Sequence, residues 1–328
     1  MVTSHLIEVP CPVCTSTRST QVLAVKDYVH RITEDTFGVR RCQVCGVGFL
    51  SPRPSARDIG SFYPNEFYWS FEESATPLTA TDVLARRRAQ IANKLRCLAH
   101  LESGRLLDIG AMKGEFVYAA LEAGWRAEGV EFAGSIPNLF NVPIRYGEFL
   151  DMEFAPAKFD CVTMWAALEH VYEPRAYVRR IAQLLADGGT FLGVVTNFNS
   201  LQARFLRADD YPRHLTLFTK SSMRKLLGEA GLEPVRFWTD QRLFGGALRG
   251  AMSYGIKRAL GYEAHEALYE MRAWRDPEAF CCKFRGQPSI AMKWVSRLDK
   301  LVLWLPEKAL DLARLGLHLG FEARKTAP

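Results

Sequence analysis

The middle of the chain alternates short apolar runs with amphipathic stretches. The apolar runs have the length and the bounding turn residues of buried strands, and the amphipathic stretches repeat apolar residues at helical spacing. The predicted strands are Arg105–Ile109, Arg126–Glu131, Ile144–Tyr146, Phe159–Trp165, Thr190–Thr196 and Pro234–Thr239. The predicted helices are Thr81–His100, Glu115–Ala123, Pro174–Ala186 and Lys220–Ala230. This alternation predicts an α/β fold with a mostly parallel sheet that helices cover on both faces.

The two ends of the chain do not follow this alternation. Residues 1–60 are rich in turn residues and contain two pairs of cysteines, and residues 61–100 hold an aromatic stretch and the first helix. After the alternating region, 101–240, residues 241–317 have a basic, helical pattern, and residues 318–328 begin with one more apolar run. We interpret this last run as the final strand of the sheet, so that residues 241–317 are a helical insertion between two strands.

Composition and charge narrow the class of protein. Of 328 residues, 48% are apolar and 24% charged, which is typical of a globular protein and excludes wholesale disorder. The sequence has no apolar run long enough for a membrane span and no secretory leader at its start, so we expect a cytoplasmic protein with reduced cysteines. The net charge of +6 falls after residue 240, where 15 Lys and Arg face 9 Asp and Glu. Because the rest is neutral, we expect no nucleic-acid partner.

Four cysteines near the start have the spacing of a metal site. Cys11-Pro-Val-Cys14 and Cys42-Gln-Val-Cys45 are two C-x-x-C pairs, 27 residues apart. Each pair lets two thiolates of one tight turn face one point, and two such turns supply the four sulfurs that structural zinc prefers. The residues between the pairs leave room for a hairpin. Redox chemistry is the competing interpretation, since a single C-x-x-C can be catalytic, but the doubled motif favours zinc.

A glycine turn follows the first strand of the alternating region. Asp108 lies near the end of that strand, and Gly110 and Gly114 let the backbone approach a ligand in front of the next helix. Glu131, at the end of the second strand, is placed to accept both hydroxyls of a ribose. The sequence therefore predicts a ribose-containing ligand at the carboxyl ends of these strands.

These features resemble the class I S-adenosylmethionine-dependent methyltransferases, over roughly residues 81–240. In that superfamily the first loop usually reads D-x-G-x-G-x-G and holds the methionine moiety, and the acidic residue after the second strand binds the ribose. The resemblance implies a Rossmann-like, seven-stranded methyltransferase sheet, with cofactor contacts by Asp108, Gly110, Ala111, Lys113, Gly114, Glu131, Phe132, Glu148 and Trp165. Met112 departs from the pattern, because it replaces the usual second glycine and narrows the loop.

Within the superfamily, the sequence is similar to a bacterial group with an N-terminal cysteine ribbon. The shared features are Cys42-Gln-Val-Cys45-Gly46, Phe49-Leu-Ser-Pro-Arg-Pro54, Leu168-Glu-His-Val-Tyr-Glu-Pro174 and His214-Leu-Thr-Leu-Phe-Thr219. Members of that group commonly modify sugars, polysaccharide precursors or secondary metabolites. The resemblance therefore implies an enzyme that methylates a small molecule, with oxygen favoured over carbon or nitrogen as the methylated atom.

Two histidines are the candidates for catalysis. His170 follows the fourth predicted strand, on the sheet edge where the cofactor lies, and His214 lies in the loop after the fifth. An imidazole titrates near neutrality and suits the removal of a hydroxyl proton. The alternative is that His170 caps or packs the next helix and that His214 only fixes its loop. We expect His170 to face the acceptor, with His214 as the next candidate.

The insertion carries apolar stripes at helical spacing, with Pro306 between two predicted helices. The favoured interpretation of residues 289–318 is packing or homodimerisation. The alternative is peripheral contact with the inner face of a membrane, where tryptophan and lysine are favoured.

Two other functions stay open at this point. An RNA methyltransferase could use the cysteine ribbon to grip RNA, although residues 1–60 hold no basic cluster beyond Arg40 and Arg41. A non-catalytic binding protein could retain the fold, since Met112 narrows the loop.

Overall fold

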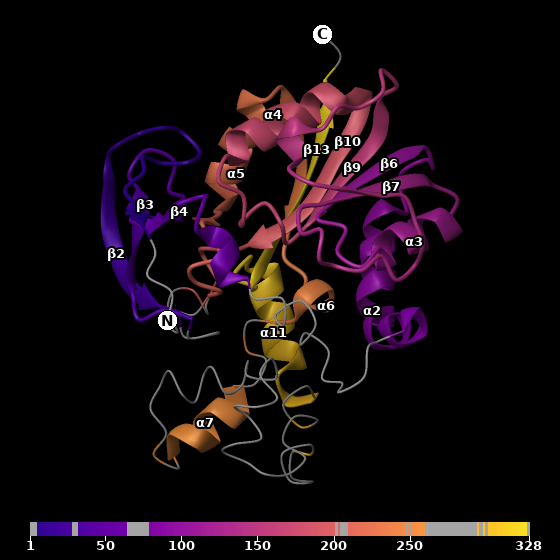
Figure 1. Cartoon of the computed structure of the whole chain (residues 1–328). Coiled ribbons are helices and arrows are strands. Elements are labelled where there is room, and N and C mark those ends of the chain that lie inside the picture. The colour runs from indigo at the N-terminus through magenta and orange to yellow at the C-terminus, as the bar shows by residue number, and fades with distance from the viewer. Residues whose placement is uncertain are drawn as a thin grey trace.

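The computed structural model describes most of the chain. The described residues are 5–27, 32–63, 79–200, 203, 209–246, 248, 251–259, 261, 294, 298 and 301–326. They form a seven-stranded sheet with helices on both faces, and two smaller sheets that include the N-terminal strands (Figure 1).

The large sheet confirms the predicted fold class. Its strand order is β12-β13-β10-β9-β6-β7-β8. The strands are β6 (Arg105–Ile109), β7 (Arg126–Glu131), β8 (Ile144–Tyr146), β9 (Phe159–Trp165), β10 (Leu185–Thr196), β12 (Leu232–Trp238) and β13 (His318–Lys325). The five strands from β10 to β8 are parallel, whereas β13 is antiparallel to both β10 and β12. The last apolar run is thus a strand inside the sheet, and β6 and β9 lie side by side at its centre.

Each face of this sheet has its own apolar core, because successive side chains of a strand point to opposite faces. Leu107 and Val162 face the side covered by α4 (Pro174–Leu184) and α5 (Lys220–Glu229). Their neighbours Leu106 and Cys161 face the side of α2 (Ala80–Leu98) and α3 (Glu115–Glu122).

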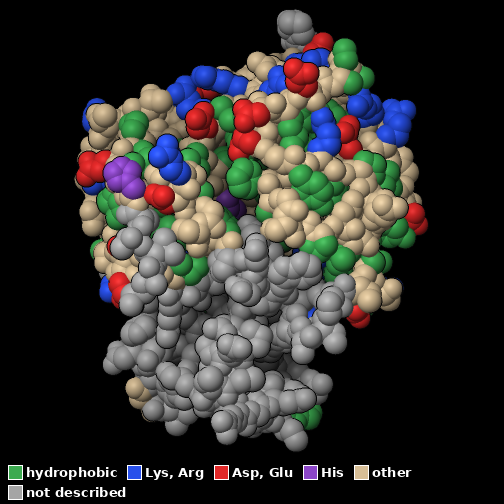
Figure 2. All heavy atoms as spheres, viewed as in Figure 1, with side chains coloured by type: hydrophobic (Ala, Val, Ile, Leu, Met, Phe, Trp, Pro, Cys, Tyr) green, Lys and Arg blue, Asp and Glu red, His purple; other side chains and the backbone are tan. Residues whose placement is uncertain are grey.

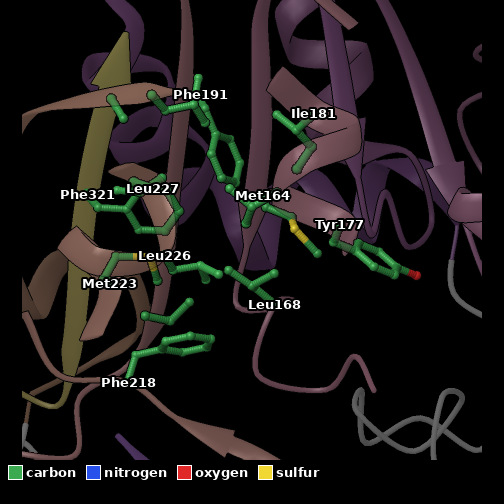
Figure 3. Close-up of a cluster of buried hydrophobic side chains, with 14 of the residues drawn as sticks. Met164, Leu168, Tyr177, Ile181, Phe191, Phe218, Met223, Leu226, Leu227 and Phe321 are labelled. Atoms are coloured by element: carbon green, nitrogen blue, oxygen red, sulfur yellow. The ribbon is translucent and has the colours of Figure 1, made fainter. Parts of the chain in front are cut away.

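Figure 3 shows the core beneath α4 and α5. Strand and loop residues meet residues of both helices there, and the labelled side chains are Met164, Leu168, Tyr177, Ile181, Phe191, Phe218, Met223, Leu226, Leu227 and Phe321. This packing fixes the loop that follows β9, because Leu168 is fully buried in it.

The N-terminal strands form two small sheets. The pair β1 (Leu6–Ile7) and β5 (Arg53–Pro54) is antiparallel, and the other sheet has the order β11-β4-β3-β2. Its strands are β2 (Ser19–Lys26), β3 (Thr36–Cys42), β4 (Gly48–Leu50) and β11 (Thr216–Leu217). The antiparallel pair β2–β3 is the expected hairpin between the cysteine pairs. The fourth strand, β11, comes from the central part of the chain, so the two regions share a sheet.

The structure differs from the sequence prediction at two helix boundaries. The helix predicted over Pro174–Ala186 ends at Leu184, because Leu185 pairs with Phe159 and starts β10 ahead of a register shift. The break between the two helices lies at Leu303 instead of Pro306: residues 301–302 are helical, and α11 (Trp304–Leu312) has the proline in its first turn. A proline is tolerated there, since the N–H it lacks has no partner within the helix.

The rest of the insertion is described in part. It contains α6 (Gln241–Phe244), α7 (Ala251–Ala259) and α11, and two 3-10 turns lie elsewhere, η1 (Ile59–Phe62) and η2 (Phe149–Asp151). Most of residues 289–300 lie outside the described residues, so packing, dimerisation and membrane contact there stay predictions. Among the described helices, none is long and apolar enough to cross a membrane.

Candidate active site and metal centre

The four predicted cysteines converge on one point. Cys11 and Cys45 place their Sγ atoms 3.5 Å apart, as do Cys14 and Cys42, and all four sulfurs lie within 4.8 Å of one another. Tetrahedral zinc with Zn–S bonds of about 2.3 Å requires sulfurs about 3.8 Å apart. Backbone N–H groups of Cys14 and Val44 donate to Cys11 and Cys42 Sγ at 3.4 Å, which suits thiolates. The donor set therefore fits a tetrahedral metal ion.

The glycine turn after β6 folds against the end of β7. The N–H groups of Gly110 and Ala111 donate to the carbonyl of Val130, at 2.8 and 3.0 Å. Gly110 and Gly114 have φ of +85° and +90°, and Met112 also lies in the left-handed region, at +51°. A side chain at position 112 thus costs some strain, which glycine would avoid. The loop nevertheless follows a closed path, because Met112 N–H donates to Glu131 Oε2 at 2.9 Å.

Glu131 is the anchor of this loop. Its other oxygen, Oε1, accepts from the N–H of Ala133 at 3.0 Å, and the side chain is buried. Burial raises the pKa of Glu131, while the N–H groups of Ala133 and Met112 oppose the rise. The carboxylate therefore stands at the junction of the glycine turn and β7, where the resemblance places the ribose site.

Asp108 lies beneath the turn and is also buried. Thr163 on β9 donates from Oγ1 to Asp108 Oδ1 at 2.6 Å. Burial raises the pKa of Asp108 to about 7, although the ammonium of Lys94 on α2 opposes the rise. Lys94 Nζ lies 5.4 to 5.5 Å from the ring centres of Phe116, Trp165 and Phe244. Sequence reasoning missed Lys94, because only the fold brings α2 under the glycine turn.

The other residues that the resemblance assigns to the cofactor surround this turn. Phe132, directly after Glu131, is 66% exposed and free to stack on a ligand, whereas Lys113 is buried. Glu148 accepts hydrogen bonds from the Tyr177 hydroxyl and from a backbone N–H in η2. Trp165 is buried at the end of β9, and its indole N–H has no partner within the described structure. Their contacts with a cofactor stay predictions.

The structure brings both candidate histidines together. The rings of His170 and His214 meet edge to face, with centres 4.5 Å apart. His214 Nδ1 lies 2.6 Å from Asp209 Oδ1, and His170 Nδ1 lies 2.9 Å from the Tyr63 hydroxyl. The sequence analysis did not predict these roles of Asp209 and Tyr63. No local pattern shows that Tyr63 contacts a residue more than a hundred positions later in the chain.

The environments of the two histidines push their pKa values apart. Burial lowers the pKa of His170 to about 3, helped by the neighbouring His214. Burial alone would also lower the pKa of His214, but the carboxylate of Asp209 outweighs it and raises this pKa to about 8. Burial raises the pKa of Glu169, next to His170, to about 7 against the opposing effect of His214. A neutral imidazole, an imidazolium–carboxylate pair and a buried carboxyl group thus share one cluster.

The loop between β9 and α4, which carries His170, lies beside the glycine turn. A Cβ at Gly110 would lie 2.9 Å from Ala167 Cβ, so the backbone of Gly110 approaches the loop that carries His170. This loop follows β9, and the turn follows its neighbour β6, at the carboxyl ends where open α/β sheets bind ligands. In the space-filling view, the described surface is hollowed near its middle, and a small area of the histidine colour is visible inside the hollow (Figure 2). The arrangement therefore unites a cofactor-type loop with an acid–base cluster.

The loop that carries His214 is tied to the N-terminal module. Arg213 is fully buried and forms ion pairs with Asp27 at the end of β2, at 2.8 Å, and with Asp210, at 3.0 Å. The next residues enter β11, which pairs with β4, and the Ser221 hydroxyl donates to the carbonyl of Cys45 at 3.2 Å. The metal centre and His214 are thus linked through one short sheet.

Comparisons with known proteins place this site in a family. Residues 83–236 match the model of the methyltransferase domain family. No curated protein matches the chain significantly.

Among solved structures, the chain is similar to the CcbJ methyltransferase from Streptomyces caelestis, with 17% identity and a TM-score of 0.40 over 47% of this chain and 87% of that one. It is also similar to the magnesium protoporphyrin IX methyltransferase from Synechocystis PCC 6803, with 15% identity and a TM-score of 0.43 over 57% and 95% of the two chains.

The family match covers most of α2, the strands β6 to β11 and most of β12, and the glycine turn and His170 lie in the segments between them. The chain therefore contains a domain of the methyltransferase family, at residues 83–236, and by that domain it is a methyltransferase enzyme.

Proposed function

We propose that this enzyme transfers a methyl group from S-adenosylmethionine to a hydroxyl of a small molecule, such as a sugar, a polysaccharide precursor or a secondary metabolite. The observation that carries the proposal is the approach of the glycine turn at Gly110 to the loop that carries His170. A donor held by the turn and an acceptor held by the histidine loop would meet at one sheet edge.

The glycine turn and Glu131 would bind the cofactor. Asp108, Gly110, Ala111, Lys113 and Gly114 would enclose the methionine moiety, Glu131 and Phe132 the ribose and base, with Glu148 and Trp165 at the margins. When bound, S-adenosylmethionine supplies an electrophilic methyl group on a positively charged sulfur. The protein must then hold an acceptor oxygen in line with it, so positioning is its main contribution.

The base in this proposal is His214 rather than His170. A base works best when its pKa lies near the operating pH, and a group with a pKa of about 3 removes a hydroxyl proton poorly. Asp209 holds Nδ1 of His214, so Nε2 is the ring nitrogen that would accept the proton of the acceptor hydroxyl. The carboxylate also stabilises the imidazolium that results. His170 positions the His214 ring through the edge-to-face contact.

A structural zinc ion is the proposed occupant of the cysteine cluster. Four cysteines in a closed set, with no position left for substrate, are typical of structural rather than catalytic zinc. The ion would hold the N-terminal sheet together, and with it the strand pair β4–β11 next to His214.

Cofactor binding tests the proposal directly. Calorimetry should show that the wild-type protein binds S-adenosylmethionine. Replacing Glu131 with alanine removes a charge-assisted hydrogen-bonding partner and should weaken binding about tenfold or more. The matched control is Glu128→Ala on the same strand. The Glu128 carboxylate pairs with the partly exposed Arg105 and Arg145, so this substitution should leave cofactor affinity unchanged.

Unchanged affinity in Glu131→Ala would place the cofactor elsewhere, and no binding by the wild type would favour the non-catalytic binding protein. Titration with RNA at varied salt tests the RNA alternative, whose binding would weaken steeply as salt rises.

The role of His170 has its own test. His170→Ala removes the ring that contacts His214 and Tyr63, so turnover should fall by about tenfold or more while cofactor affinity stays within twofold. His170→Phe keeps an aromatic edge and should recover part of the rate if the residue positions His214. A larger loss in His170→Phe than in His214→Ala would instead make His170 the base.

A further inference from the structure

Arg53 occupies an unusual place between the N-terminal module and the histidine loop. It lies in β5, within the Ser51-Pro-Arg-Pro54 motif, and is only 7% exposed. Its guanidinium lies over the ring of Tyr172, 4.6 Å from the ring centre, and Nη2 donates weakly to the Tyr172 carbonyl at 3.5 Å. The Tyr172 hydroxyl donates in turn to the carbonyl of Pro54 at 2.8 Å. Arg53 is thus held against the loop that carries His170.

Most of the hydrogen-bonding capacity of Arg53 is unused. Nε and Nη1, which carry three of its five N–H groups, are buried and have no partner within the described structure. Burial lowers the pKa of Arg53, while Tyr172 and Glu173 oppose the shift, but no described carboxylate lies within ion-pair distance. Arg213, which is fully buried, has two carboxylates.

A buried charge without a partner destabilises a fold, so its retention needs a reason. Packing alone does not supply one, because an uncharged side chain of similar length would also cover the Tyr172 ring. Stacking uses only the flat face of the guanidinium and leaves its edge for hydrogen bonds. That edge matches the paired oxygens of a phosphate or a carboxylate.

We infer that Arg53 is an anion-binding residue for the methyl acceptor, and that it takes a phosphate or carboxylate group of that molecule. The inference rests on the proposed function, because it uses the same acceptor site. Tyr172 is two residues from His170, so an anion on Arg53 would anchor the acceptor beside the histidine pair. The substrate class is then an anionic small molecule, and the N-terminal module contributes to its recognition.

Titration of the metal-loaded protein with simple anions tests this inference. Pyrophosphate and malonate serve as probes, with unfolding temperature and calorimetry as readouts. One of them should bind the wild type and raise its unfolding temperature. Arg53→Gln should weaken that binding about tenfold or more, whereas Arg57→Gln, at an exposed arginine of the same segment, should not. Arg53→Lys keeps the positive charge but lacks the paired N–H groups of the guanidinium, so its affinity for the anion should lie between those of the wild type and Arg53→Gln.

Stability without added anion separates a ligand-binding role from a structural one. Arg53→Gln removes an unpartnered buried charge, so its unfolding temperature should equal or exceed that of the wild type. The inference would be overturned if Arg53→Gln had a lower unfolding temperature than the wild type and bound the anions with unchanged affinity. Binding of pyrophosphate alone identifies a phosphorylated acceptor, and binding of malonate alone identifies a carboxylate.

The two proposals fail in different ways. If the wild type does not bind S-adenosylmethionine, the proposed function is wrong. If it binds the cofactor while neither anion binds through Arg53, only the inference about the acceptor is wrong.

Discussion

Replacing His214 with alanine is expected to lower turnover by about 10²–10⁴-fold, the usual contribution of a positioned base. Affinity for S-adenosylmethionine should stay nearly unchanged, because the glycine turn and Glu131 do not contact this side chain. The measurement is turnover with saturating cofactor, together with cofactor binding by calorimetry. His5→Ala, at an exposed histidine of the N-terminal segment, is the control and should behave as wild type. A His214→Ala variant with full turnover would remove the base from this loop.

The pH dependence of turnover follows from the same pair. His214 must be neutral to accept a proton, so turnover should rise with pH and level off above its pKa of about 8. The carboxylate of Asp209 raises that pKa, and Asp209→Asn should therefore shift the rise to lower pH while also lowering the plateau. A profile whose midpoint does not move in Asp209→Asn would show that another group controls the rate.

Removal of the metal is expected to have the second large effect. Structural zinc contributes about 10–16 kcal/mol in small zinc-binding domains, so Cys42→Ser should lose the ion and unfold the N-terminal module. Unfolding of this module should also abolish turnover, because β4 would no longer pair with β11 next to His214. Metal analysis, circular dichroism and turnover check the three parts of this prediction.

A chelator provides a second route, which does not depend on expression of the cysteine variant. Protein stripped by a chelator should lose turnover and still bind S-adenosylmethionine, because the glycine turn belongs to the large sheet. Cys97→Ser, at a cysteine outside the cluster, should keep its metal. A metal-free wild type with full stability and turnover would contradict the assignment of zinc.

Local pattern predicted most of the large sheet. The strands Arg105–Ile109, Arg126–Glu131 and Phe159–Trp165 were predicted with the limits that the structure has, because each is a short segment with apolar positions between turn residues or amphipathic stretches. Leu185 was assigned to the helix before it, since its pairing with Phe159 depends on a partner that local sequence does not show. The pairing of β11 with β4 was missed for the same reason.

In the candidate site too, features encoded in local motifs could be predicted, whereas contacts that depend on the fold could not. The four cysteines follow from the spacing of two C-x-x-C pairs and the glycine turn from its strand–glycine–helix pattern, whereas the other cofactor residues are expected from the family resemblance. Asp209, Tyr63 and Arg53 act on partners that are distant in sequence or depend on burial, and no spacing rule indicates them. The choice between His170 and His214 as the candidate base also needed the structure. Burial lowers the pKa of His170, whereas the carboxylate of Asp209 raises the pKa of His214.

The position of β13 has a consequence for the making of the protein. This strand lies between β10 and β12, although residues 239–317 separate it from β12 in the chain. During synthesis, one apolar edge of β10 therefore stays unpaired until β13, which ends at Lys325, has been made. Exposed edges of this kind recruit strands from other chains. A ribosome that stalls before His318 would release an aggregation-prone product, so yield in the cell should depend on chaperones that shield the nascent sheet and on uninterrupted translation of the insertion.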